Sequence, residues 1–362
     1  MKIGVLWKSF KAHEKRYPLY WKHLNKLSKN ELNSLYFEAG YPNLDKVKYP
    51  VQILSRKDIF KVCDVVVLIK PDSEDYKYFR KGQTIWGWTH TVQNYAITDI
   101  AICNQLTLIA FANMFKYHLD VKKGHVFARN NELAGYAAVN HFFSLEGLTA
   151  GIYGPHQKIA VLGFGAVARG AVQALLGLGA TDITVFSKRS KFELVGALKN
   201  IKYKTYTFND NKVMIGDILA AHTLLGYDII VNAVLQNPTK PMMFLNSSDI
   251  TEKKPMIIDV SCDEGMGFDF AKPTTFEQPI IKTDKFIYYA VDHAPSHFFN
   301  AASYEISGAL MPYLKYVIAH NTFEGSTTLE KSIDIKHGHI INKKVINFQN
   351  RQSNFPHKIK KK

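Results

Sequence analysis

A glycine-rich turn near the middle of the sequence constrains the fold more than any other feature. Residues 163–168 read Gly-Phe-Gly-Ala-Val-Ala, between an apolar run at 158–162 and a stretch with helical spacing at 167–178. In a strand–turn–helix unit, Gly163 permits the tight turn, Gly165 lets the backbone approach a pyrophosphate, and Ala168 lets the helix pack closely on the strand. The helix N–H groups would face the phosphates. The turn therefore predicts a dinucleotide-binding α/β sheet.

Short apolar runs alternate with helical stretches on both sides of this turn. Further candidate strands follow it at 183–186, 228–232, 256–260 and 286–290. Others precede it at 3–7, 51–54, 65–69, 84–86 and 106–110. A helix at 131–146 would join two lobes, and a long helix at 303–320 would return the chain to the first lobe. This alternation predicts the α/β class, with two Rossmann-like lobes and a doubly wound parallel sheet in the second.

The expected domain boundaries follow from this pattern. We expect a substrate-binding lobe built from residues 1–130 plus 291–350, and a dinucleotide-binding lobe at 131–290. Residues 351–362 would form a basic tail. From 331 to 362 the chain has nine Lys or Arg against Asp334 alone, which is about half of the net charge of +15. We expect this end to be solvated, with nucleic-acid binding as the alternative.

Cysteine usage and hydropathy bear on the compartment. The three cysteines, Cys63, Cys103 and Cys262, lie far apart and form no Cys-x-x-Cys pair, which favours neither a disulfide framework nor a metal site. The most apolar longer stretch, 100–115, contains polar residues and is shorter than the roughly 20 residues that span a bilayer. We expect a cytoplasmic homo-oligomer without a membrane segment.

The end of the second strand of the dinucleotide lobe predicts the cofactor. NAD-selective folds place an Asp or Glu there, where it binds the ribose diol. This strand instead ends in Ser187-Lys188-Arg189. A hydroxyl and two cations would pair with a 2′-phosphate, which a carboxylate would repel. NADP(H) is therefore the expected cofactor, although a solvated Lys–Arg pair is the alternative; Arg169 would be a further phosphate contact or merely exposed.

Several separated motifs together resemble the alanine dehydrogenase and transhydrogenase superfamily. The resemblance is closer to the N5-(carboxyethyl)ornithine synthases, with fungal saccharopine dehydrogenases as more distant relatives, and it extends to about Arg351. The motifs that carry it are Glu14–Leu19, Val66–Pro71, Trp86–His90, Asn131–Gly135, the glycine turn, Asp259–Asp263 and Val291–Ser296.

Two departures from alanine dehydrogenases bear on the substrate. That family has Lys-Glu-Pro after the strand where this chain has Lys70-Pro71. It also has Asn-Met-Pro-Gly-Ala near the end, where this chain reads Asp-His-Ala-Pro-Ser at 292–296. The second segment resembles the synthase and saccharopine branch. Alanine is therefore not the expected substrate.

The chemistry of a reductive condensation fits the residues that the resemblance singles out. Joining a 2-oxo acid to an amine requires a carboxylate anchor, a polarised carbonyl, proton transfer and a hydride donor. Arg16 offers a bidentate fork to the carboxylate, and Lys70 can stabilise charge at the carbonyl oxygen. His90 can move protons near neutral pH. The resemblance places Lys70 and His90 at the catalytic pair and Arg16 at the substrate-anchoring arginine.

Two acidic residues complete the expected substrate site. The resemblance places Asp263 near the nicotinamide. Asp292 would receive the ammonium of the second substrate or, with Ser296, cap the returning helix. Trp86 and Trp88 would wall the pocket or belong to the core.

The expected reaction is NADPH-dependent condensation of pyruvate with the side-chain amine of a diamino acid, ornithine or lysine. The alternatives are oxidative deamination of a small amino acid such as alanine, saccharopine dehydrogenase-like activity, and a non-catalytic protein that binds NADP or nucleic acid.

Overall fold

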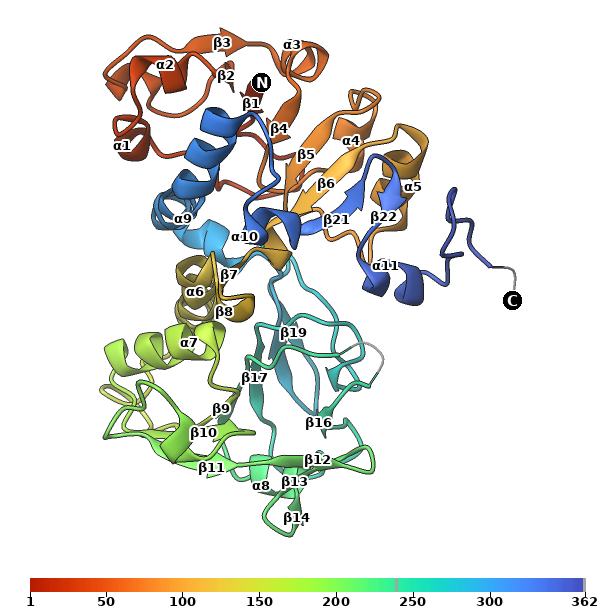
Figure 1. Ribbon diagram of the computed structural model, residues 1–362. Helices are drawn as coiled ribbons and strands as arrows, with labels where there is room; N and C mark the ends of the chain where they lie inside the picture. The colour runs from red at the N-terminus through yellow and green to blue at the C-terminus, as the bar shows by residue number, and fades with distance from the viewer. Residues whose placement is uncertain (238–239, 361–362) are drawn as a thin grey trace. The chain divides into compact units, whose positions relative to one another are not determined.

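The computed structural model describes residues 1–237 and 240–360 of the chain and divides it into two compact units (Figure 1). The first unit contains Met1–Ala128 and Phe299–Lys362, and the second contains Arg129–Phe298. Residues 291–298 therefore cluster with the second unit, and the last residues described cluster with the first. Both units are α/β, and each is built around one large sheet.

The sheet of the first unit has the strand order β22-β21-β6-β5-β4-β1-β2-β3. The six strands from β3 to β6 run parallel, and β21 and β22 add an antiparallel edge. The order of the parallel strands is that of a doubly wound fold, which changes direction between β1 and β4. The strands of this sheet are β1 (Ile3–Val5), β2 (Leu35–Glu38), β3 (Gln52–Leu54), β4 (Val65–Val67), β5 (Thr84–Gly87), β6 (Thr107–Ala110), β21 (Ile333–Lys336) and β22 (His339–Ile340).

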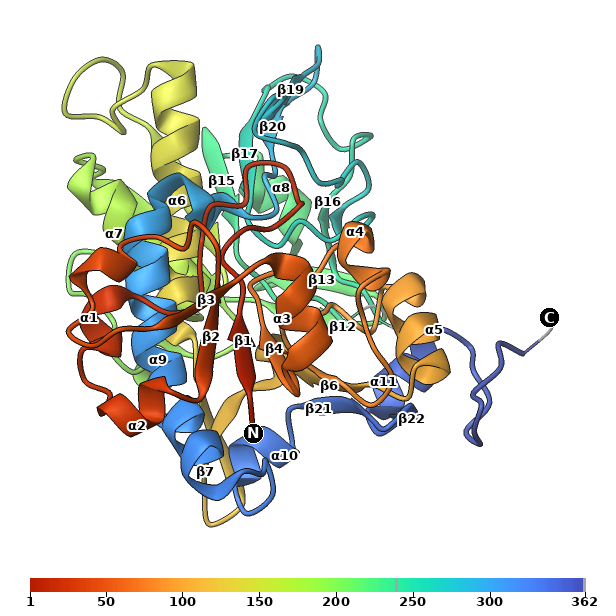
Figure 2. The ribbon, with the colours of Figure 1, turned by 90° about the horizontal axis from the view of Figure 1, so that it is seen from above.

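Helices cover both faces of this sheet because its strands bury side chains on alternate sides. Val65 and Val67 pack in one core cluster with Ile306 and Leu310 of α9, whereas Val66 packs in another, beside α3 and α5. Figure 2 shows α9 lying along the strands. The helices of the unit are α1 (Trp21–Leu24), α2 (Lys29–Leu32), α3 (Arg56–Val62), α4 (Ser73–Tyr76), α5 (Tyr95–Cys103), α9 (Phe299–His320), α10 (Thr327–Glu330) and α11 (Lys343–Phe348). A hairpin, β7 (Phe115–His118) with β8 (Val121–His125), and two 3₁₀ turns, Leu44–Lys46 and Phe111–Asn113, complete it.

The sheet of the second unit has the order β11-β10-β9-β15-β17-β20-β19, again doubly wound, with only β19 antiparallel. Its strands are β9 (Lys158–Leu162), β10 (Asp182–Ser187), β11 (Lys202–Thr205), β15 (Ile229–Asn232), β17 (Met256–Asp259), β19 (Ile280–Lys282) and β20 (Ile287–Tyr289). Smaller sheets are formed by β12 (Thr207–Asn209), β13 (Lys212–Ile215) and β14 (Ile218–Leu219), and by β16 (Met243–Leu245) and β18 (Gly267–Phe268). The predicted fold class, including a doubly wound parallel sheet around the glycine turn, is confirmed.

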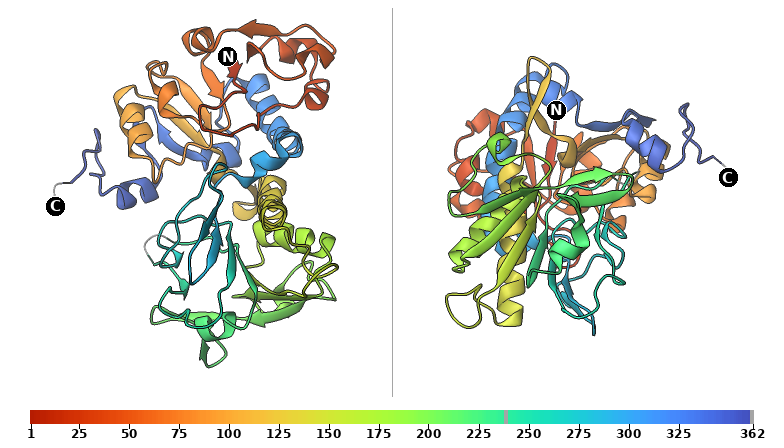
Figure 3. Two further views of the ribbon diagram at one scale, coloured as in Figure 1. Left: turned by 180° about the vertical axis from the view of Figure 1, so that it is seen from behind. Right: turned by 90° about the horizontal axis from the view of Figure 1, so that it is seen from below.

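Two glycines bring the helices on one face of this sheet into backbone contact. The helices of the unit are α6 (Ala128–Glu146), α7 (Ala166–Gly177) and α8 (Ala220–Leu224), with 3₁₀ turns at Lys191–Glu193 and Ala294–Phe298. A Cβ on Gly135 of α6 would lie 1.9 Å from the carbonyl oxygen of Val167, and one on Gly170 of α7 would lie 1.7 Å from that of Glu132. Figure 3 shows these two helices side by side. Only glycine permits this approach.

The C-terminal segment is anchored at two residues, although its composition predicts a solvated tail. Arg351 is 3% exposed, and its guanidinium donates to Gln349 and Asp99. His357 is 2% exposed and accepts a hydrogen bond from the backbone N–H of Ile340 in β22 (3.0 Å). Both side chains find hydrogen-bonding partners on the first unit, which composition alone does not reveal. Residues 352–356 and 358–360 are exposed, as the composition suggests, whereas Arg351 and His357 tie the segment to the first unit.

Candidate active site

The glycine turn has the geometry that a dinucleotide requires. Gly163 has φ +92°, and its N–H donates to the carbonyl of Phe186 (2.7 Å). A Cβ there would lie 3.1 Å from the carbonyl oxygen of Ala233, at the point where the strand order changes direction. Gly165 precedes α7 as its N-cap, and a Cβ on it would meet nothing within 4 Å, so space is open above this backbone. Ala168 is fully buried. The turn fits a pyrophosphate at the start of α7.

The end of β10 presents cations beside this turn. Ser187 is buried, and its hydroxyl accepts a hydrogen bond from the backbone N–H of Arg189 (3.1 Å), which orders the loop. Lys188 and Arg189 are exposed. Glu193, the nearest acid along the loop, is bound to Ser190, which lowers its pKa. Segment 187–189 therefore exposes two cations and no carboxylate, and the Ser187 hydroxyl lies beneath them.

Arg169, considered above as a phosphate contact, is held by the protein. Its guanidinium lies 4.7 Å from the ring of Phe164 and donates to the carbonyl of Val195.

Three predicted site residues lie at one edge of the sheet in the first unit. Arg16 is in the loop after β1, Lys70 follows β4, and His90 follows β5. These strands are parallel neighbours, so their carboxyl ends meet at the same edge. Hydrogen bonds continue the pairing beyond the strands, since the N–H of Trp88 donates to the carbonyl of Ile69 (2.9 Å). This edge lies at the point where the strand order changes direction, which is where ligands bind in open α/β sheets.

Arg16 is buried, and contacts with Glu14 and Trp88 fix the orientation of its planar guanidinium. Its Nε and Nη2 donate to the two carboxylate oxygens of Glu14 at 2.8 and 2.6 Å, and the side chain of Glu14 is fully buried. The guanidinium lies 5.2 Å from the ring of Trp88. A paired, stacked arginine is pre-organised for a planar anion. Trp88 thus contacts a site residue, whereas Trp86 belongs to the core, where its indole N–H donates to Met114.

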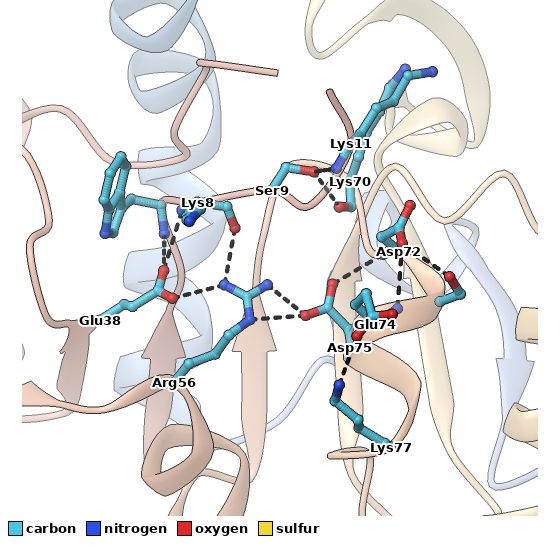
Figure 4. A network of polar contacts seen from close by, with 12 residues as sticks. Lys8, Ser9, Lys11, Glu38, Arg56, Lys70, Asp72, Glu74, Asp75 and Lys77 are labelled. Carbon is cyan, nitrogen blue, oxygen red and sulfur yellow. Dashed lines mark hydrogen bonds and ion pairs between the residues drawn. The ribbon is translucent and has the colours of Figure 1, made fainter. Parts of the chain in front are cut away.

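The loops that carry Lys70 and residues 7–11 are joined by a network of polar contacts (Figure 4). Lys70 is half-buried, and its carbonyl accepts from the hydroxyl of Ser9 (3.0 Å). Beside it, Arg56 bridges Glu38 (2.8 Å) and Asp75 (2.5 Å), and it also donates to the carbonyl of Lys8 (3.0 Å). Burial raises the pKa of Asp75, and Arg56 opposes that rise. This network braces the edge of the sheet.

His90 occupies a strained backbone position. Its φ is +48°, in the left-handed region that residues other than glycine seldom adopt. The backbone N–H groups of Gln93 and Asn94 donate to its carbonyl at 3.1 and 3.0 Å, which holds the turn. The side chain is exposed. Such strain persists where surrounding contacts fix it, and it is common at functional sites.

In the second unit, a buried acid organises the loop that carries Asp263. Asp259 ends β17 and is fully buried, accepting hydrogen bonds from Tyr288 (2.9 Å), Asn232 (3.0 Å) and the N–H of Ser261 (3.1 Å). Burial raises its pKa to about 6 despite these bonds. Asp263 is half-buried four residues later, and burial raises its pKa to about 6 as well. Since β9 and β17 are parallel in one sheet, this loop lies at the same edge as the glycine turn.

Asp292 follows β20 in the same unit and is exposed. One of its carboxylate oxygens bonds Nδ1 of His293, whose buried ring meets Phe276 edge-on at 5.0 Å. This hydrogen bond holds the Asp292 carboxylate against the side chain of the next residue.

Sequence reasoning missed the residues that support the site. Glu38, Arg56 and Asp75 are far apart in the sequence, and no local pattern joins them. Asp259 lies inside a motif that carried the family resemblance, and its place at the end of an apolar strand is the one signal that could have marked it.

No helix in the described ranges 1–237 and 240–360 is long and apolar enough to cross a membrane.

Comparisons with known proteins agree with this architecture. The family model described as "Alanine dehydrogenase/PNT, C-terminal domain" matches residues 133–343. The N(5)-(carboxyethyl)ornithine synthase of Clostridium botulinum is 28% identical over 332 residues, which cover 87% of this chain and 94% of that protein. The alanine dehydrogenase of Staphylococcus haemolyticus is 23% identical, with 78% of each chain covered. A solved L-alanine dehydrogenase has a TM-score of 0.78 at 21% identity, covering 96% of this chain and 99% of that one. Since the family model covers more than half of its length, the chain belongs to the alanine dehydrogenase/PNT family.

Proposed function

We propose that this protein is an NADPH-dependent enzyme that condenses pyruvate with the side-chain amine of ornithine or lysine and reduces the resulting imine. Its family makes it an oxidoreductase of the dehydrogenase kind. The observation that carries the proposal is that Arg16, Lys70 and His90 follow three neighbouring parallel strands at one edge of a sheet. The similarity to N(5)-(carboxyethyl)ornithine synthase over most of both chains favours this substrate pair over alanine.

The second unit would hold the cofactor. Gly163, Gly165 and Ala168 form the cradle for the pyrophosphate, and segment 187–189 would pair with a 2′-phosphate. NADPH, when bound, supplies the hydride that reduces the imine carbon.

Arg16 would hold the carboxylate of the 2-oxo acid. Its Nε–Nη2 edge is bound to Glu14, which fixes the orientation of the guanidinium that the substrate would meet. A fixed anchor fixes the carbonyl carbon as well, which reduces the entropy lost on reaching the transition state. Lys70, close behind β4, would donate to the carbonyl oxygen and stabilise the charge that develops there when the amine attacks.

His90 would move the protons of imine formation. A side-chain ammonium has a pKa of about 10.4 and must lose a proton before it can attack, so a nearby base is required. After attack, the hydroxyl of the carbinolamine leaves as water once it gains a proton, and His90 can return it. The negative charges of the Asp263 and Asp292 carboxylates would stabilise the protonated imine and the protonated amine.

The test is oxidation of NADPH by the purified chain with a panel of 2-oxo acids crossed with a panel of amines. Oxidation should require both partners and be fastest with pyruvate and ornithine or lysine. Alanine dehydrogenase-like activity, which the chain's family also suggests, predicts turnover with pyruvate and ammonia alone. A saccharopine dehydrogenase-like enzyme would instead prefer 2-oxoglutarate with lysine. No oxidation with any pair would refute the enzyme proposal.

A further inference from the structure

The first unit contains a cavity of about 890 Å³ at the loop after β1. Residues 7–15 and Tyr17 line it from that loop, Asn43 lines it from the turn after β2, and Phe299 and Asn300 line it from the start of α9. Lys70 and His90 do not line it. Its size is in the range of pockets that bind small molecules.

One residue that lines this cavity has a buried hydroxyl that makes no hydrogen bond within residues 1–237 and 240–360. That residue is Tyr17, which is 2% exposed. The Asn43 side chain lies close enough to lower the pKa of Tyr17, but the two groups do not meet in hydrogen-bond geometry. Burial is the larger influence and raises the pKa of Tyr17 to about 12, so the hydroxyl keeps its proton. A buried donor without a partner is costly, and a bound acceptor would relieve that cost.

The other polar groups that line the cavity are mainly donors and cations. The Oδ1 atom of Asn43 accepts from the ammonium of Lys46 (2.8 Å), which leaves the NH₂ of the amide as its remaining donor group. Lys8, Lys11 and Lys15 add positive charge. Glu14 is the one acidic residue among the lining residues, and its carboxylate binds Arg16. A carboxylate, which only accepts hydrogen bonds when ionised, matches this set.

We propose that this cavity binds the α-carboxylate end of the amine substrate and thereby selects amino acids over the corresponding diamines. The inference rests on the proposed function, whose product carries two carboxylates. Arg16 would hold the one from the 2-oxo acid, and the cavity would hold the other. Glu14 connects the two places, because it lines the cavity and also binds Arg16. A diamine would instead place a second ammonium among lysines.

The test is equilibrium binding of L-ornithine and of putrescine to the full chain by calorimetry, alongside steady-state kinetics. Wild type is compared with Tyr17→Phe, which removes only the hydroxyl, and with Asn43→Gly, which removes the amide and tolerates the φ of +57° found there. Tyr20→Phe is the matched control, because its ring stacks on Tyr17 at 6.0 Å but does not line the cavity.

Each cavity variant should weaken ornithine binding and raise its KM roughly tenfold, the effect of one lost hydrogen bond to a charged group. The kcat and the KM for pyruvate should not change, and neither should the weaker binding of putrescine. Tyr20→Phe should match wild type. Turnover with ornithine at an unchanged KM in both cavity variants would overturn the inference and leave the reaction standing. Ornithine binding that depends on Tyr17, without turnover of any substrate pair, would overturn the reaction and support the cavity.

Discussion

The network around Arg56 gives a sharp prediction for the stability of the first unit. Arg56→Met keeps the length of the side chain but removes its bonds to Glu38, Asp75 and the carbonyl of Lys8. Asp75 is fully buried, so its carboxylate loses its charge partner while it stays out of water. Breaking a buried ion pair from one side costs about 3–5 kcal/mol. We expect a loss of this size near neutral pH.

The pH dependence of this loss follows from the same group. Burial raises the pKa of Asp75 above its unfolded value, and without Arg56 the pKa should rise further. A raised carboxyl pKa means that stability is fully present below the unfolded pKa and is lost as pH rises through the folded pKa. The variant's deficit should therefore be larger at about pH 8 than at about pH 5.5.

Tryptophan fluorescence during urea unfolding is a suitable assay, because all four tryptophans, Trp7, Trp21, Trp86 and Trp88, lie in the first unit. Lys77→Met, at the residue that follows α4, is the matched control (Figure 4), since its ion pair with Glu74 is exposed on both sides and should contribute nothing measurable. If Arg56→Met unfolds at the same urea concentration as Lys77→Met, the network does not brace this edge.

Four further predictions concern the cofactor, the chemistry and the C-terminal segment. Replacing both cations of segment 188–189 with serine should cost about 2–4 kcal/mol of NADPH binding and raise the KM for NADPH far more than that for NADH; equal use of both cofactors by wild type would refute the assignment. His90→Gln and Lys70→Met should each lower kcat by about 10²–10⁴-fold while NADPH affinity, measured by fluorescence titration, stays unchanged. If Asp263 acts as a carboxylate, kcat/KM should fall as pH falls through about 6, and Asp263→Asn should abolish that limb of the profile. His357→Ala should destabilise the first unit by about 1–3 kcal/mol, because the N–H of Ile340 loses its acceptor; a free tail would show no change.

The fold was largely predictable because its strongest signals are local. The turn at 163–168 and its flanking strand and helix lie within about twenty residues, and the apolar runs at 65–69 and 158–162 became β4 and β9. Shorter strands escaped prediction. Residues 35–38 form β2 because they pair with β1 and β3 on both sides, and this pairing is not visible in four residues read alone.

The candidate site was predictable only in part, for the same reason. Arg16, Lys70 and His90 lie within motifs in the loops that follow β1, β4 and β5, so a resemblance could single them out as candidates. The contacts that fix them are long-range. Arg56 meets Glu38 and Asp75 only after β2, α3 and α4 have formed, and a composition-based expectation cannot foresee that His357 finds a partner in β22.

The most direct test of the proposed reaction is the mass of the product formed from pyruvate, ornithine and NADPH in which both hydrogens at C4 of the nicotinamide are deuterium. The product should be heavier than ornithine by pyruvic acid less one oxygen atom, and it should carry one deuterium on the carbon that was the carbonyl of pyruvate. Deuterated alanine as the product when ammonia is also supplied, with ornithine unconsumed, or a product without deuterium, would contradict the proposed reaction.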